Sequence, residues 1–164
     1  MIRRTISVAV VAALLLATAG AAQASSKHRL TATAKLGYVS ISGVLPTARV
    51  TLGGTLNARP GGKGTLVSTI KYGGYQAVNV ARFGGTFRAF VPHGSLRGTL
   101  KGTATAQALN KVAYAGTLTV TGGTNLYAGA TGKLKFTGGT TLQLPVTVLP
   151  VAVTSIRLTG TLTY

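Results

Sequence analysis

The sequence predicts an all-β protein, and three observations lead to this fold class. From residue 25 onward the chain is rich in Gly, Thr, Val and Leu and contains little that favours a helix. Apolar and polar residues alternate with a period of two, as in strands that bury one face. Short turn segments containing Gly or Pro separate the alternating stretches. Together these features indicate an antiparallel meander, closed as a barrel or folded as a sandwich.

Residues 96–104 and 155–164 define the two faces of the predicted sheet most clearly. In both stretches Leu, Ile and Gly alternate with Arg, Lys, Ser and Thr. We expect the apolar set to point inward: Leu96, Leu100, Ile156, Leu158 and Leu162. We expect the cationic set to face water: Arg97, Lys101 and Arg157. Glycine on the inward face suits a small barrel, whose tight interior needs small residues beside large ones.

The other predicted strands follow the same alternation. They are residues 39–45, 48–56, 64–72, 77–83, 86–91, 113–121, 133–137 and 140–148. Turns are predicted at 59–62, 72–74, 92–94 and 137–139, where Gly and Pro cluster. Pro145 and Pro150 bracket 146–149, and their missing N–H groups indicate an edge, a bulge or a loop excursion there.

The first 24 residues have the pattern of a secretory signal peptide. Arg3 and Arg4 form a positive start, an apolar run follows, and Ala22-Gln23-Ala24 gives the small-x-small pattern of a cleavage site. An uncleaved anchor is the alternative, although the apolar run is short for a spanning helix. We therefore predict a signal peptide at 1–24, a flexible basic N-terminal arm at 25–33, and one barrel domain at 34–164. The protein is expected to be secreted or associated with the cell envelope.

The charge balance is one-sided. The chain has 17 Lys plus Arg and no Asp or Glu, and 15 cations remain once Arg3 and Arg4 are removed with the signal peptide. No salt bridge between side chains can form, so these charges must be spread over solvent, screened by salt or neutralised by a partner. There is no Cys, so stability must come from apolar burial and backbone hydrogen bonds.

This composition excludes several kinds of site. Carboxylate pairs, Ser-His-Asp triads, carboxylate or Cys metal sites and thiolate chemistry all need residues that the chain lacks. His28 and His93 are the only side chains that could act as an acid or a base near neutral pH. Both are predicted in loops without an orienting partner. We therefore predict no catalytic residue, no metal site and no cofactor.

The segment from Tyr114 to Gly138 is the most distinctive. It predicts a strand, a break at Gly122-Gly123, a compact turn and a second strand from Gly132, with Tyr127 and Ala130 closing the end of the sheet. It resembles a hairpin of the allene oxide cyclase and dirigent barrel superfamily, through Thr121, Gly122, Gly123, Thr124, Tyr127, Ala128, Ala130 and Gly132. Asn125 stands where that family often has Gly, and Asn also tolerates a left-handed backbone. The resemblance implies an eight-stranded antiparallel barrel. It carries over no catalytic residue, because the plant enzymes hold polar, partly acidic residues in the cavity and this chain has no carboxylate to place there.

The basic residues are the main candidates for binding. Those in or near predicted strands include Arg82, Arg88, Arg97, Lys101, Lys111, Lys133, Lys135 and Arg157. The residues predicted to bind a polyanion are Arg88, Arg97, Lys101, Lys133, Lys135 and Arg157. One interpretation is adhesion to a polyanion such as teichoic acid, anionic lipid or nucleic acid. The other is a solvated surface that keeps an exported protein soluble.

Three functions follow from these features. The first is a non-catalytic, secreted barrel that binds an anionic polymer or a small apolar ligand in its mouth. The second is a cyclase-like isomerase that confines a reactive substrate, which a large apolar open cavity would favour and a filled barrel would contradict. The third is a small outer-membrane barrel, because the alternation ending at Tyr164 resembles the last strand of such proteins, although aromatic girdles are lacking.

Overall fold

The fold consists of strands alone. A computed structural model describes residues 25–44, 47–141 and 153–164. The strands are β1 (Lys27–Ser42), β2 (Arg49–Arg59), β3 (Gly62–Ala77), β4 (Val80–Val91), β5 (Gly94–Ala108), β6 (Lys111–Asn125), β7 (Thr131–Thr141) and β8 (Thr154–Thr163). The described residues contain no helix that could cross a membrane.

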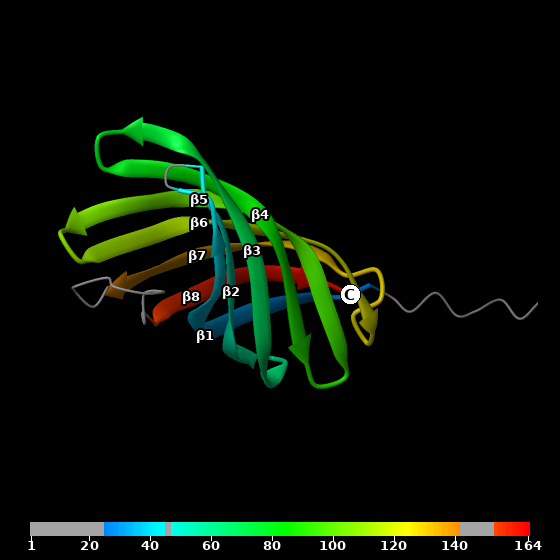
Figure 1. Cartoon of the computed structure of the whole chain (residues 1–164). Helices are drawn as coiled ribbons and strands as arrows, with labels where there is room; N and C mark the ends of the chain where they lie inside the picture. Colours follow the sequence, from blue (N-terminus) through cyan, green and yellow to red (C-terminus); the bar gives the residue numbers. More distant parts are fainter. Residues whose placement is uncertain (1–24, 45–46, 142–152) are drawn as a thin grey trace, which may run out of the picture.

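The eight strands form a closed up-and-down barrel (Figure 1). Each strand pairs antiparallel with the next, and β1 closes the ring by pairing with β8, with Ala32 opposite Leu158. The closed ring leaves no free edge strand. The prediction of a single antiparallel barrel of about eight strands is confirmed, and the sandwich alternative is wrong.

The two faces of the barrel wall are as predicted. Leu96, Leu100, Leu158 and Leu162 are buried in the interior, and Ile156 is partly buried against the same core. The predicted outward cations are exposed: Arg97, Lys101 and Arg157. Apolar burial therefore fills the inside of the barrel, while charge stays in water.

The start of the barrel differs from the prediction. Residues 25–33 are not a flexible arm, because β1 begins at Lys27 and pairs with the end of β8 from that residue onward. Alternation is present in this segment, but its inward residues include the small side chains of Ala32 and Ala34. Such small residues give a weak hydrophobic signal, and closure of the ring requires β1 to be long enough to pair with two neighbours.

Two of the turns predicted from glycine are wrong. Residues 72–74 form an irregularity within β3, where the register with β4 shifts, and residues 137–139 lie inside β7. Stretches 77–83 and 86–91 belong largely to one strand, β4. The turns predicted at 59–62 and 92–94 are present at the joins of β2 to β3 and β4 to β5. The predicted signal peptide, Pro145, Pro150 and residues 142–148 of the predicted strand 140–148 lie outside the described residues.

The Tyr114–Gly138 hairpin forms as a strand, a turn and a strand, without the predicted break. β6 runs through Gly122 and Gly123 to Asn125, and β7 begins at Thr131. Asn125 has the left-handed backbone expected of it, with φ of 54°. Tyr127 and Ala130 in the turn are 4% and 0% exposed. The prediction that they close this end of the barrel is confirmed.

Candidate functional site

The interior has three parts along the barrel axis. We call the end that holds the turns β2–β3, β4–β5 and β6–β7 the closed end. We call the end that holds the turns β3–β4 and β5–β6 the open end.

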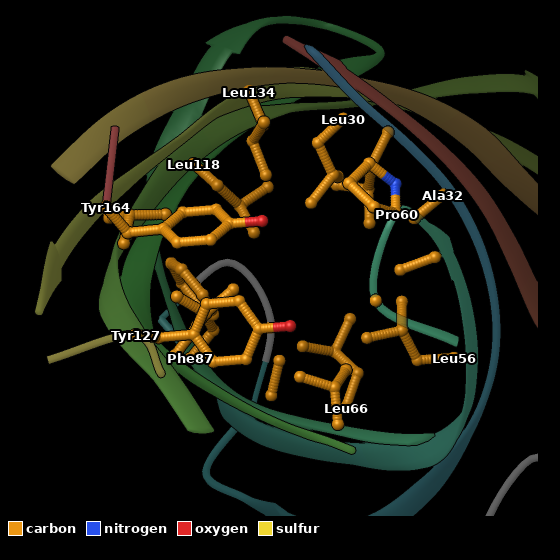
Figure 2. Close-up of a pocket in the computed structure, with 17 residues that line it drawn as sticks. Leu30, Ala32, Leu56, Pro60, Leu66, Phe87, Leu118, Tyr127, Leu134 and Tyr164 are labelled. Atoms are coloured by element: carbon orange, nitrogen blue, oxygen red, sulfur yellow. The ribbon is translucent and has the colours of Figure 1, made fainter. Parts of the chain in front are cut away.

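Aromatic rings plug the closed end. Tyr127 and Tyr164 meet edge to face with ring centroids 5.0 Å apart, and His28 stacks on Tyr164 at 4.4 Å. Figure 2 shows both tyrosine hydroxyls pointing into a space that is lined by Leu, Ala and Phe side chains and by Pro60. The cavity that remains there is about 30 Å³. This volume is suited to a water molecule and not to an organic ligand.

The middle of the barrel is filled by aromatic and aliphatic side chains. Phe83 lies 6.2 Å from Phe136 and 6.1 Å from Tyr114, measured between ring centroids. The void among these residues is about 40 Å³. The Thr154 hydroxyl lies on its wall, is buried, and has no hydrogen-bond partner among the described residues. A ligand cannot pass through the barrel without moving this core.

The open end contains a hollow of about 580 Å³, which we call the bowl. Its wall is almost entirely apolar and comes from β1 through β6. The residues that line it are Tyr38, Ile41, Gly43, Val44, Ala48, Val50, Tyr72, Tyr75, Val78, Asn79, Ala81, Ala104, Ala106, Val112 and Tyr114. This volume and lining are typical of sites for small apolar molecules.

Three tyrosines line the inner part of the bowl: Tyr38, Tyr72 and Tyr114. The hydroxyl oxygens of Tyr38 and Tyr114 are 3.5 Å apart. Burial raises the pKa of Tyr72 to about 12, and the hydroxyl of Tyr38 nearby adds to the effect. Burial also raises the pKa of Tyr114 well above its usual range. Tyr72 and Tyr114 therefore stay neutral at physiological pH, so they can donate or accept hydrogen bonds but cannot act as bases.

The two histidines lie away from the bowl. His93 is exposed in the turn between β4 and β5 at the closed end, as predicted, with φ of 68°. His28 was predicted in a loop but lies in β1, where its ring packs on Tyr164 and bonds to the Ser26 hydroxyl. No group of three or more His, Cys, Asp or Glu that could hold a metal occurs in the described part of the chain. Acid or base chemistry in the bowl therefore has no side chain to carry it near neutral pH.

The exterior carries positive charge on every strand. All 15 cations from residue 25 onward lie in the eight strands, and each is exposed. The predicted polyanion-binding residues lie in β4, β5, β7 and β8, and none of them is in β6. Arg88 faces Arg97 across β4 and β5, and Lys101 is separated from Lys135 by Thr117 of β6. Lys133 lies beside Lys135 on β7, and Arg157 of β8 is opposite Thr137. Threonines thus separate many of the charges, and the six residues form a broad face and not a compact cluster.

A second basic feature was missed by the sequence reasoning. An open groove of about 420 Å³ runs over the outside of β1, between Arg59 of β2 and Arg157 of β8. Its floor includes Thr31, which is the register partner of Arg59, and Thr33, which is the partner of Arg157. The two arginines are 98 positions apart in the chain. Only barrel closure brings them to the two sides of one strand.

Comparisons of the chain with models of protein families, with curated proteins and with solved structures find no match. The resemblance of the Tyr114–Gly138 hairpin to the allene oxide cyclase and dirigent superfamily stays a prediction.

Proposed function

We propose that this protein is a secreted, non-catalytic binding protein that holds a small apolar molecule in its bowl. The bowl is the observation that carries the proposal, because it combines a volume of about 580 Å³ with an apolar wall and an opening to solvent. The hydroxyls of Tyr38, Tyr72 and Tyr114 would orient a polar group of the ligand by hydrogen bonds.

The bowl also bears on the isomerase alternative. The filled middle of the barrel disfavours a deep reaction chamber, whereas the bowl itself is open and apolar as confinement would require. Binding without chemistry is favoured because the described bowl residues include no group that titrates near neutral pH.

The outer-membrane alternative has less support. A barrel that spans lipid needs its apolar side chains outside and its polar ones inside. Here Leu100 and Leu158 are buried inside, and Lys101 and Arg157 are exposed outside. Fifteen exposed cations around the wall would have to enter hydrocarbon, which is costly.

The test of the bowl is a titration with N-phenyl-1-naphthylamine, a neutral dye that becomes fluorescent in apolar surroundings. Ala106 lines the bowl and is exposed, so Ala106→Trp would fill part of it with little strain on the core. Ala115 is exposed on the outer face of β6, so Ala115→Trp is the matched control. We expect Ala106→Trp to weaken dye binding by about tenfold or more, and the control to leave it unchanged. Equal affinity in both variants would reject the bowl as the site.

We propose polyanion binding as a second function, because the chain carries exposed cations on every strand and no acidic side chain. Binding releases condensed counterions, so affinity should fall steeply with salt, with a log–log slope of about −0.9 per phosphate neutralised on duplex DNA. Lys101→Ala or Lys133→Ala alone should weaken binding modestly, and combined substitutions on one face should weaken it much more.

The measurement is a titration of the protein with teichoic acid and with DNA at low and at physiological salt. We expect poor discrimination between the two polymers, because sequence-specific readout needs base contacts that a spread of strand cations does not supply. Absence of binding at low salt would mean that the charge only solvates the surface.

A further inference from the structure

Large apolar side chains are exposed around the mouth of the bowl. Val78 and Leu109, at the tips of the β3–β4 and β5–β6 turns, are 101% and 90% exposed, and Val44 after β1 is 80% exposed. Ile41 and Tyr75, also exposed, lie on the bowl wall behind these tips. We call these five residues the apolar rim.

The closed end lacks a comparable set. Among the described residues, the exposed large apolar side chains there are Leu126 and Phe90, at 52% and 46%. Val39 and Val67 are exposed too, but they lie on the outer wall, beside Gly53 of β2. Exposed apolar groups are therefore concentrated at the tips of the open end. Four of the rim residues, Ile41, Val44, Tyr75 and Val78, line the same hollow, and an exposed apolar patch of this kind marks an interaction site.

Cations lie directly behind the rim. Lys111 follows Leu109 by two residues, at the start of β6. Arg82 lies at the start of β4, where its Nε donates a hydrogen bond of 2.8 Å to the Gln76 side chain on the same hairpin. Arg49 begins β2, opposite Ser42 at the end of β1. The open end thus presents apolar tips backed by positive charge.

We propose that the apolar rim docks onto an anionic lipid surface, with the barrel standing on its open end. Val44, Val78 and Leu109 would enter the boundary between headgroups and acyl chains, while Arg49, Arg82 and Lys111 meet the anionic headgroups. Tyr75, with its aromatic body and polar hydroxyl, suits the same boundary. Since no side chain is acidic, no side chain of the protein repels such a surface.

The positive charge of the protein also favours a lipid surface over a second copy of this chain as the partner of the apolar rim. Two copies meeting mouth to mouth would bring together two bodies that each carry 15 uncompensated cations, and their repulsion opposes the contact. An anionic membrane attracts the same charges. Docking does not depend on a ligand in the bowl, so it can fail or succeed independently of the proposed function.

The test is flotation of the protein with vesicles of phosphatidylcholine, with and without about a third of phosphatidylglycerol. Val78→Ser with Leu109→Ser removes two rim side chains that contribute little to folding, because both are almost fully exposed. Leu126→Ser with Phe90→Ser is the matched control at the closed end. We expect the rim pair to weaken binding to anionic vesicles by about tenfold or more, and the control pair to have little effect. All variants share one N-terminus, so any contribution of residues 1–24 cancels.

Two double variants test where the charge acts. The first removes two cations at the open end, by Arg82→Gln with Lys111→Gln. The second removes two cations at the closed end, by Arg29→Gln with Lys63→Gln, and has the same net charge as the first. The two ends are separated by strands of 10 residues or more, a distance well beyond a Debye length of about 8 Å at physiological salt. We expect the first pair to reduce binding by about tenfold and the second pair to have little effect.

Three results would overturn the proposal. The first is equal loss in both charge pairs, which would mean that lipid binding follows net charge without orientation. The second is unchanged binding in Val78→Ser with Leu109→Ser. The third is a dimer in sedimentation that this rim pair dissociates, which would assign the rim to a second copy of the chain.

Discussion

Leu158 offers the sharpest test of the assignment of side chains to the interior and the exterior of the barrel. Its side chain is 4% exposed and lines both small interior voids, of about 30 and 40 Å³. Leu158→Ala removes three carbon atoms, and the lost transfer free energy is about 2.4 kcal/mol at about 0.8 kcal/mol per carbon. A residual void of about 60 Å³ adds about 1.5 kcal/mol.

The wall of the barrel gives little relief from this void. β8 is held by backbone pairing to both β1 and β7, so the strands cannot move inward without breaking the ring. We therefore expect Leu158→Ala to lower the free energy of unfolding by about 4 kcal/mol, within the range of about 2–5 kcal/mol seen for such substitutions.

The assay is urea unfolding followed by circular dichroism, with Arg157→Ala as the neighbouring control. Arg157 is exposed and should change stability by less than about 0.5 kcal/mol. A loss below about 1 kcal/mol for Leu158→Ala, or an equal loss in the two variants, would refute the assignment of Leu158 to a packed interior.

Three further predictions follow. Gly116→Ala would place a Cβ 2.2 Å from the Lys101 carbonyl oxygen, so we expect a loss of about 2 kcal/mol or more in urea unfolding. Gly73→Ala, which meets nothing within 4 Å, should be neutral, and a similar loss in both would contradict this reasoning. Burial raises the pKa of Tyr72 to about 12, above its unfolded-state value of about 10. Its contribution to stability is therefore complete below about pH 10 and is lost as the pH rises toward 12. The measurement is the difference in unfolding free energy between wild type and Tyr72→Phe at alkaline pH. A difference that does not depend on pH would contradict this prediction. Protein recovered outside the producing cell should begin near Ser25, and intact Met1 on cytoplasmic protein would rule out the signal peptide.

The all-β fold and the division of its residues between two faces could be predicted from the sequence. Alternation of Leu and Gly with Lys, Arg and Thr in 96–104 and 155–164 separates an apolar face from a polar one. Which of the two faces points inward was decided by the structure, because a membrane barrel would show the same alternation. The turn around Tyr127 could also be predicted, because Asn125 and the small residues beside it permit the required backbone. The absence of Asp, Glu and Cys by itself restricts the chemistry that this protein can perform.

The wrong turn predictions concern glycines, because glycine occurs both in turns and inside the strands of a tight barrel. Gly138 was predicted in a turn, but it lies in β7 with its Cα so close to β8 that a Cβ would approach the Ser155 carbonyl oxygen to 2.1 Å. A tightly coiled barrel needs glycine at such close approaches, and a turn needs it for unusual dihedral angles. The two uses look alike in a single sequence.

The bowl, the apolar rim and the groove between Arg59 and Arg157 were decided by tertiary structure alone. The bowl depends on how far each strand extends past its neighbours, which is set by the stagger of the closed ring. The rim joins Val44, Val78 and Leu109 from three separate connections, and the groove joins residues of β2 and β8 across β1. Local alternation predicts which residues share one side of the wall. The height of a residue along the barrel and its neighbours around the ring follow only from the register of all eight strands.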